Sequence, residues 1–147
     1  MDTVLITGGA GFIGIHTSIS LLEKGFRVVI IDSLLNNSRK GVDRLKNKHY
    51  LGISILNSQL KFIRGDVRDI NFLRKVFNKE KILGNNIRYV IHFAGLKSVR
   101  DSFLHQDLYW DVNVNGTKIL TKVMEENGCY NFVFSSSATV YGLSLIH

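Results

Sequence analysis

The residues from Thr3 to Gly14, TVLITGGAGFIG, constrain the fold of this chain more than any other part of its sequence. A short β-branched apolar run leads directly into a cluster of glycines, and an amphipathic stretch follows without a break. In such a motif Gly8 permits a tight turn, Gly11 lets the backbone approach a pyrophosphate, and Gly14 lets the helix pack close to the strand. The free N–H groups at the start of the helix then face the phosphates. The segment therefore predicts a strand–turn–helix unit that binds a dinucleotide.

Short apolar runs alternate with longer amphipathic segments along the rest of the chain. The pattern predicts strands over 3–7, 27–31, 60–64, 89–93 and 132–135, and helices over 12–24, 70–78 and 108–127. Strands that alternate with helices form βαβ units with right-handed crossovers, and hence a parallel sheet. We expect an α/β fold, a doubly wound parallel (Rossmann-type) sheet of order 3-2-1-4-5, in one domain over residues 1–147. The lysine-rich stretch that runs to about residue 58 gives no firm prediction.

The composition is that of an ordinary globular domain, with 45% hydrophobic and 21% charged residues. No apolar run approaches the roughly 18 residues of a membrane span, and no secretory signal precedes the first strand. Cys129 is the only cysteine, which excludes an internal disulfide and a cysteine-only metal site and fits a reducing compartment. We expect a soluble, cytoplasmic protein without a metal or a membrane partner.

The net charge of +7 raises the possibility of a nucleic-acid partner. The excess lies mainly in two stretches, Arg39–Lys48 and Arg68–Lys81. In the second, apolar and basic residues alternate at helical spacing, as on a solvated helix face. The aromatic and basic pattern of an RNA-binding sheet is missing from the sequence. We therefore expect no nucleic-acid partner.

Two aspartates follow predicted strands at positions where a dinucleotide is usually held. Asp32 stands 18 residues after Gly14, where an acidic side chain accepts hydrogen bonds from the adenosine ribose. Its charge would repel a 2′-phosphate and favours NAD over NADP, although Arg39 and Lys40 nearby oppose that preference. Asp66 can reach the adenine edge. The alternatives are a turn cap for Asp32 and a helix N-cap for Asp66.

Three further residues invite a functional interpretation, and for each we favour a structural one. His92 lies within an apolar strand, so we expect a core histidine with satisfied hydrogen bonds rather than a ligand. Tyr109 and Trp110 fall on the long helix and are expected to pack against the protein rather than to stack on a base.

With these motifs, the sequence resembles the UDP-glucose 4-epimerase family of extended short-chain dehydrogenases/reductases. The resemblance rests on four motifs, which are TGGAGFIG at 7–14, HFAGLKSV at 92–99, NVNGT at 113–117 and FSSSATVYG at 134–142. The second and fourth are the more specific to this family. The resemblance covers nearly the whole chain but only the N-terminal part of the family's length, so we expect a fold that stops before the final strands and the substrate domain.

The resemblance implies an NAD site and a UDP-sugar substrate. The implied cofactor-binding residues are Gly8, Gly11, Phe12, Ile13, Gly14, Asp32, Ser33, Asn36, Asn37, Asp66, Val67, Phe93, Ala94, Gly95, Lys97 and Asn113. Lys97 would contribute positive charge, and Ser137 resembles the active-site residue that hydrogen-bonds the reacting hydroxyl of the sugar. The family usually has asparagine where this chain has Val112, which puts one cofactor contact in doubt.

The family's reaction is oxidation of the sugar at C4 by NAD, rotation of the keto intermediate and return of the hydride. Its proton passes to the tyrosine of a Tyr-x-x-x-Lys pair, and none of the five tyrosines here has lysine four residues later. We therefore expect a fragment that is inactive alone. A homodimer is implied for the family, formed by two long helices of which 108–127 is one. The alternatives are a related nucleotide-sugar dehydratase or decarboxylase, an NAD-binding module without catalysis, and a remnant that does not fold.

Overall fold

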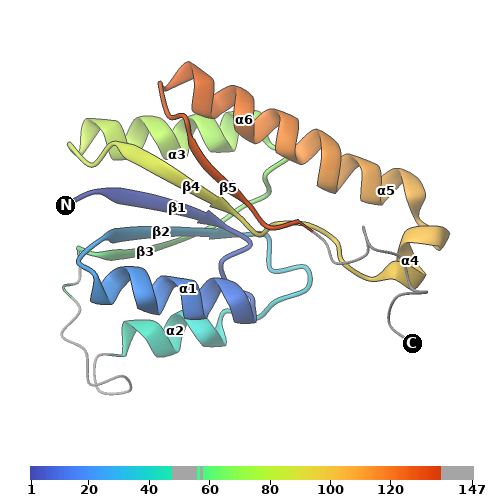
Figure 1. Cartoon of the computed structure of the whole chain (residues 1–147), viewed down its shortest axis with the longest axis horizontal. Coiled ribbons are helices and arrows are strands. Elements are labelled where there is room, and N and C mark those ends of the chain that lie inside the picture. Colours follow the sequence, from blue (N-terminus) through green and yellow to red (C-terminus); the bar gives the residue numbers. More distant parts are fainter. Residues whose placement is uncertain (48–55, 57, 137–147) are drawn as a thin grey trace.

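The computed structural model describes residues 1–47, 56 and 58–136 of the chain. Its centre is a parallel sheet of five strands in the order β3-β2-β1-β4-β5 (Figure 1), which confirms the predicted fold class and strand order. The strands are β1 (Thr3–Thr7), β2 (Arg27–Asp32), β3 (Leu60–Arg64), β4 (Ile87–His92) and β5 (Asn131–Phe134). The predicted strand ends differ from these by no more than two residues.

Helices cover both faces of the sheet, α1 and α2 on one side and α3 and α6 on the other (Figure 1). The helices are α1 (Phe12–Glu23), α2 (Lys40–Lys46), α3 (Ile70–Ile82), α4 (Val99–Leu104), α5 (Gln106–Trp110), the π-helical η1 (Asp111–Asn115) and α6 (Gly116–Glu126). The predicted helix over 108–127 corresponds to α5, η1 and α6, with a π-helical segment that the periodicity does not reveal. Helix α3 runs four residues further than predicted, while α2 and α4 were not predicted.

The central strands are buried on both faces, as expected for a parallel sheet between two helix layers. Every residue of β1 and β2 is buried, and successive side chains enter opposite halves of the core. Leu5 and Val29 pack in the cluster that includes residues of α3 and α6, whereas Ile6 and Ile30 pack in the cluster that includes residues of α1 and α2. The apolar runs that predicted these strands are thus explained by burial on two sides.

Strand β5 is much less covered than the strands at the centre. Val133 is 59% exposed and Phe134 is 54% exposed. In the part of the chain that the structure describes, β5 pairs with β4 alone. Among the described residues, the backbone groups on its second edge have no strand partner and lie beside apolar side chains.

The amino end of the sheet contains a buried cluster of charges. The carboxylate of Glu80 on α3 has no exposed side-chain area and accepts hydrogen bonds from Arg27 Nη2 at 2.8 Å and from Lys61 Nζ at 2.6 Å. Burial raises the pKa of Glu80, but the bonds from Lys61 and Arg27 outweigh it and hold the pKa below its usual value. The cluster ties α3 to the starts of β2 and β3.

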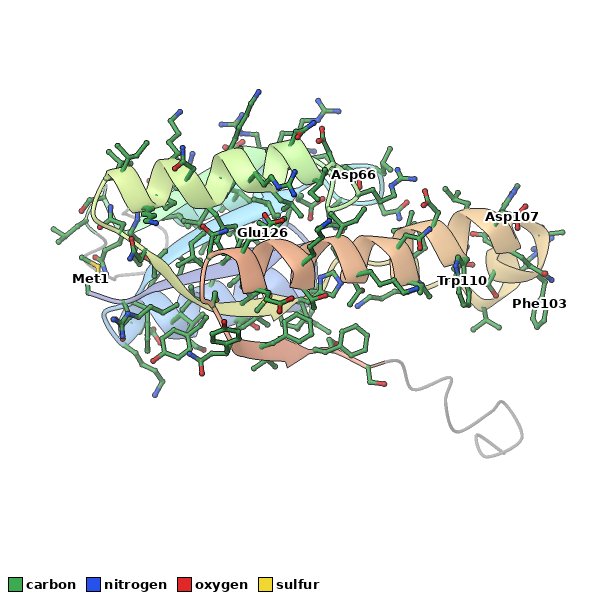
Figure 2. All side chains as sticks on the ribbon, turned by 90° about the horizontal axis from the view of Figure 1, so that it is seen from above. Met1, Asp66, Phe103, Asp107, Trp110 and Glu126 are labelled. Atoms are coloured by element: carbon green, nitrogen blue, oxygen red, sulfur yellow. The ribbon has the colours of Figure 1, made fainter. Side chains whose placement is uncertain are left out.

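At the opposite end, α4 and α5 extend past the carboxyl ends of the strands, so that Phe103, Asp107 and Trp110 lie far from Met1 (Figure 2). Trp110 is 61% exposed, so the expectation that it packs against the protein is wrong, because its helix projects beyond the sheet. Over the described residues, no helix is both long and apolar enough to cross a membrane.

Candidate functional site

A cavity of about 770 Å³ lies at the carboxyl ends of the strands. Its walls come from the turn after β1, the loops after β2, β3 and β4, and helices α4 and α5. This is the switch point between β1 and β4, where doubly wound sheets bind their ligands. The volume falls within the range of roughly 300–1,000 Å³ found for small-molecule and cofactor sites.

The cavity brings together nearly all of the cofactor-binding residues implied by the resemblance. Those that line it are Gly8, Gly11, Phe12, Ile13, Gly14, Asp32, Ser33, Asn36, Asn37, Asp66, Val67, Phe93, Ala94, Gly95 and Lys97. Asn113 is not among the lining residues, since its side-chain amide is bonded to the backbone of Leu96. Ser137 lies outside the described residues. The contacts of these residues with a cofactor stay predictions.

The three glycines of the turn differ in what the surrounding packing requires. A Cβ on Gly8 would lie 2.6 Å from the nitrogen of Ala94, and its φ of +64° favours glycine in any case. A Cβ on Gly14 would lie 2.5 Å from Gly9 Cα. Gly11 has an ordinary φ of −73°, and the nearest atom to its Cβ would be Asn37 Oδ1 at 3.4 Å. The packing of the protein therefore requires glycine at 8 and 14 but not at 11.

Helix α1 begins directly at the cavity wall. Within the described structure no side chain caps its amino end, and Phe12 and Ile13 are exposed there. The first N–H groups of an α-helix have no partners within the helix, and together with the dipole they attract anions. The uncapped end of α1 is therefore a suitable place for a phosphate group.

Asp32 is buried at the end of β2 and accepts three hydrogen bonds from the protein. Its Oδ2 accepts from the Ala10 N–H at 3.1 Å and from Asn37 Nδ2 at 3.2 Å, and its Oδ1 accepts from the Leu34 N–H at 2.8 Å. Leu34 has a φ of +61°, so the bond holds a strained turn in place. The turn-cap interpretation is thus confirmed. Since a carboxylate offers about four acceptor positions, contact with a ribose remains compatible with it.

Asp66 belongs to an ion network rather than to a helix cap. Arg68 donates from Nη2 to Asp66 at 2.7 Å and from Nη1 to Asp111 at 3.0 Å, joining the loop after β3 to η1. The bonds from Arg68 hold the pKa of Asp66 below its usual value. The N-cap of α3 is Asp69, which accepts from the Phe72 N–H at 3.0 Å. The alternative of an N-cap role for Asp66 is therefore wrong.

Buried polar groups lie on the core side of the loop after β4. His92 is 1% exposed and contacts Thr7 Oγ1 through Nδ1 at 2.5 Å and Thr117 Oγ1 through Nε2 at 2.9 Å. Burial, assisted by the charge of Lys97, lowers the pKa of His92 to about 4. The prediction of a core histidine with satisfied hydrogen bonds is confirmed.

Part of the cavity wall was missed by the sequence reasoning. Leu35 and Leu96 also line the cavity, within the loop segments that the resemblance implies, as does Val112, the position that departs from the family. The lining residues that were missed are Ile31, Gly65, Ser98, Asp101, His105, Leu108 and Tyr109. Several of these lie on or beside α4 and α5, and α4 is too short to give a periodic signal. Tyr109 faces the cavity rather than the core. Among the described residues, no group of three or more His, Cys, Asp or Glu side chains could hold a metal ion.

The comparison with protein families assigns the chain to one family. The family model described as GDP-mannose 4,6 dehydratase matches residues 5–145. The chain belongs to this family. The matched region contains the glycine turn and every residue that lines the cavity.

Individual relatives of the family confirm the resemblance to UDP-glucose 4-epimerases. The chain is 45% identical to the UDP-glucose 4-epimerase of Neisseria meningitidis serogroup A over 97% of this chain, and 45% identical to that of Haemophilus influenzae over 95% of it. It spans 38% of the length of each of these relatives.

Solved structures give the same result. The UDP-glucose 4-epimerase of Bifidobacterium longum in complex with NAD⁺ and UDP matches with a TM-score of 0.83 and 43% identity, covering 96% of this chain and 38% of that one. The enzyme of Brucella ovis in complex with NAD matches with a TM-score of 0.78 and 30% identity, covering 97% of this chain and 38% of that one.

Proposed function

We propose that the cavity binds NAD and that these residues form the NAD-binding part of a UDP-glucose 4-epimerase. The observation that carries the proposal is Gly11, whose missing side chain is not required by the packing of the protein. It lines the cavity beside the uncapped start of α1, where a Cβ would obstruct an approaching pyrophosphate. A bound NAD⁺ in the structure of the similar Bifidobacterium longum enzyme supports the choice of cofactor.

The arrangement of the loops supports one orientation of the dinucleotide. With the pyrophosphate at α1, the adenosine ribose meets Asp32 together with Ser33, Asn36 and Asn37, and the adenine meets Asp66 and Val67. The nicotinamide half then lies over β4, against the loop from Phe93 to Lys97. NAD would accept and return the hydride when bound, while this chain binds and orients it.

The charges near Asp32 favour NAD over NADP. Arg39 could in principle neutralise a 2′-phosphate, but its guanidinium lies 5.4 Å from the centre of the Phe62 ring and its Nε bonds Asp43 at 3.1 Å. Arg39 is thus engaged with other groups, and the carboxylate of Asp32 would oppose a 2′-phosphate.

The epimerase reaction and its partners are proposed for the complete enzyme. The UDP found with the Bifidobacterium longum relative supports a UDP-sugar substrate. The 147 residues hold no Tyr-x-x-x-Lys pair, so we expect this polypeptide alone not to interconvert UDP-glucose and UDP-galactose. That same observation favours an NAD-binding module without catalysis as the second candidate. The homodimer and the cytoplasmic location stay predictions.

The proposal is tested by calorimetric titration of the purified polypeptide with NAD and with NADP, alongside circular dichroism. We expect NAD to bind about tenfold more tightly than NADP, equivalent to roughly 1.4 kcal/mol, and Asp32→Asn to narrow that preference. Asparagine keeps one acceptor for the turn, whereas Asp32→Ala would also release Ala10 and Leu34. Equal affinity for NADP would contradict the assignment of Asp32. Interconversion of UDP-glucose and UDP-galactose by the polypeptide would contradict the predicted inactivity.

A further inference from the structure

A chain of buried hydrogen bonds runs beneath the loop that follows β4. It begins at Thr7 at the end of β1, passes through His92 at the end of β4 and reaches Thr117 on α6. Thr117 Oγ1 then donates to the carbonyl of Asn113 in η1 at 2.6 Å. Within the described residues none of these four lines the cavity, so any effect they have on a ligand must pass through other groups.

The position of every proton in this series of hydrogen bonds follows from the acceptor at its end, the carbonyl of Asn113. A carbonyl only accepts, so the hydroxyl proton of Thr117 points to Asn113 and its oxygen can only accept from His92. Nε2 of His92 therefore carries hydrogen, and in a neutral imidazole Nδ1 is then free to accept from the Thr7 hydroxyl. Thr7 Oγ1 in turn accepts from the Ala94 N–H at 3.2 Å. The chain has one consistent direction.

Both ends of this hydrogen-bonded series hold the loop that follows β4. Thr7 binds the Ala94 N–H, and Asn113 binds both backbone groups of Leu96, accepting from its N–H at 2.8 Å and donating to its carbonyl at 3.0 Å. Asn113 lies in the π-helical segment, a helix irregularity frequent at functional sites. The conformation of residues 93–97 is thus fixed by β1 on one side and by η1 on the other.

We infer that His92 is a positioning residue, which in its neutral Nε2–H form sets the conformation of the 93–97 loop against the nicotinamide half of the cofactor. The inference rests on the proposed function, which places that half over β4. In the proposed orientation the adenosine lies over the loops after β2 and β3 rather than against the 93–97 loop. Breaking the chain should therefore weaken binding of the whole dinucleotide but not of its adenosine diphosphate part.

The test compares NAD with ADP as probes in variants that leave the cavity wall unchanged. Thr117→Val removes the hydroxyl on which His92 depends, and Thr117→Ser restores it. Leu120→Ala, one turn further along α6 and fully buried, is the matched control for lost stability. For Thr117→Val we expect the Kd for NAD to rise about five- to tenfold, about the value of one net hydrogen bond, with the Kd for ADP unchanged. Thr117→Ser should recover most of the affinity.

Equal weakening of NAD binding and ADP binding in Thr117→Val would overturn the inference. The same ratio of the Kd for NAD to the Kd for ADP in Thr117→Val and Leu120→Ala would also overturn it. If Thr117→Val does not fold, Thr7→Val interrupts the hydrogen-bonded series at its other end. It is evaluated by the same ratio of the Kd for NAD to the Kd for ADP.

A second readout does not depend on cofactor binding. Nitrogen NMR of the unmodified polypeptide should show His92 as the neutral Nε2–H tautomer, and the opposite tautomer would overturn the inference. Amide exchange at Ala94 and Leu96 should be faster in Thr117→Val than in Leu120→Ala at equal global stability, and equal rates would also overturn it. A polypeptide that passes these tests but binds no NAD would refute the proposed function alone.

Discussion

The two ends of the sheet differ in whether they leave groups that attract charge without a partner. At the amino end, the carboxylate of Glu80 is buried and paired with both Arg27 and Lys61. At the carboxyl end, the first turn of α1 has no side-chain cap in the described structure and opens on a cavity. The comparison distinguishes two roles of polar and charged groups. Groups that are satisfied inside the protein fix the fold, and groups left without partners are available for a ligand.

The largest effect on stability is expected at the amino end. Glu80→Ala would leave Arg27 and Lys61 without their shared carboxylate, and breaking a buried ion pair in this way costs about 3–5 kcal/mol. Urea denaturation should show this loss, while the Kd for NAD, measured where the variant is folded, should not change. Loss of NAD affinity in folded Glu80→Ala would contradict the separation of the two ends. The triple variant Arg27→Met, Lys61→Met, Glu80→Leu should recover much of the stability.

Acid should weaken the two ends in different ranges of pH. The pKa of His92 is about 4 in the folded chain against 6.5 as its ordinary value, so the unfolded chain binds the extra proton between these values. Stability then falls by about 3 kcal/mol as the pH drops from 6.5 to 4. The pKa of Glu80 is held below its ordinary 4.5, so its contribution is complete above about pH 4.5 and is lost as the pH falls below that value.

The measurement is the free energy of unfolding between pH 7 and 4.5 for the natural chain and for His92→Phe. We expect a shallower slope in the variant, because the titrating group is gone. Equal slopes would show that His92 does not titrate as a buried neutral group.

Within four residues, the glycine turn contains one glycine that the packing requires and one that we propose only the ligand requires. Gly8→Ala places a Cβ against the backbone of Ala94 at a positive φ, and we expect it to reduce stability by about 1–3 kcal/mol. Gly11→Ala has an ordinary φ and no close neighbour, so its effect should stay within about 0.5 kcal/mol. Thermal unfolding of both variants checks this, and equal losses would contradict the distinction.

The smallest effect on stability is expected at the exposed strand β5. Val133→Lys adds a charge beside an edge that is unpaired in the described part of the chain, and edge lysines oppose strand-to-strand association. Light scattering should show less self-association, with the unfolding free energy changed by no more than about 0.5 kcal/mol. Thr121→Lys, an exposed site on α6, adds the same charge away from the edge and should have no such effect.

The carboxyl end of the sheet could be predicted well from the sequence. The glycine turn and Asp32 carry local signals, because the chemistry of a tight turn and of a strand end requires particular residues at fixed spacing. The strand order followed from the alternation of strands and helices. Fifteen of the sixteen residues implied for the cofactor line the cavity, and only Asn113 does not.

The amino end could not be predicted, because Arg27 and Glu80 are far apart in the sequence and neither belongs to a motif. The short helices α2 and α4 also gave no signal, since six or seven residues are too few to show a helical period. In the outer wall of the cavity, His105 belongs to no motif, and Tyr109 lies on the predicted helix over 108–127 but was expected to pack against the protein. The π-helical segment contains Asn113, whose hydrogen bonds to Leu96 are tertiary contacts that sequence spacing does not encode.

The most direct test of the account is calorimetric titration of NAD into the natural polypeptide and into Gly11→Ala, each with circular dichroism. The account predicts that both chains fold alike, that the natural chain binds NAD at one site, and that Gly11→Ala binds it about tenfold or more weakly. A folded natural chain that binds no NAD, or a Gly11→Ala variant that binds it equally well, would contradict the claim that the turn is shaped for a pyrophosphate.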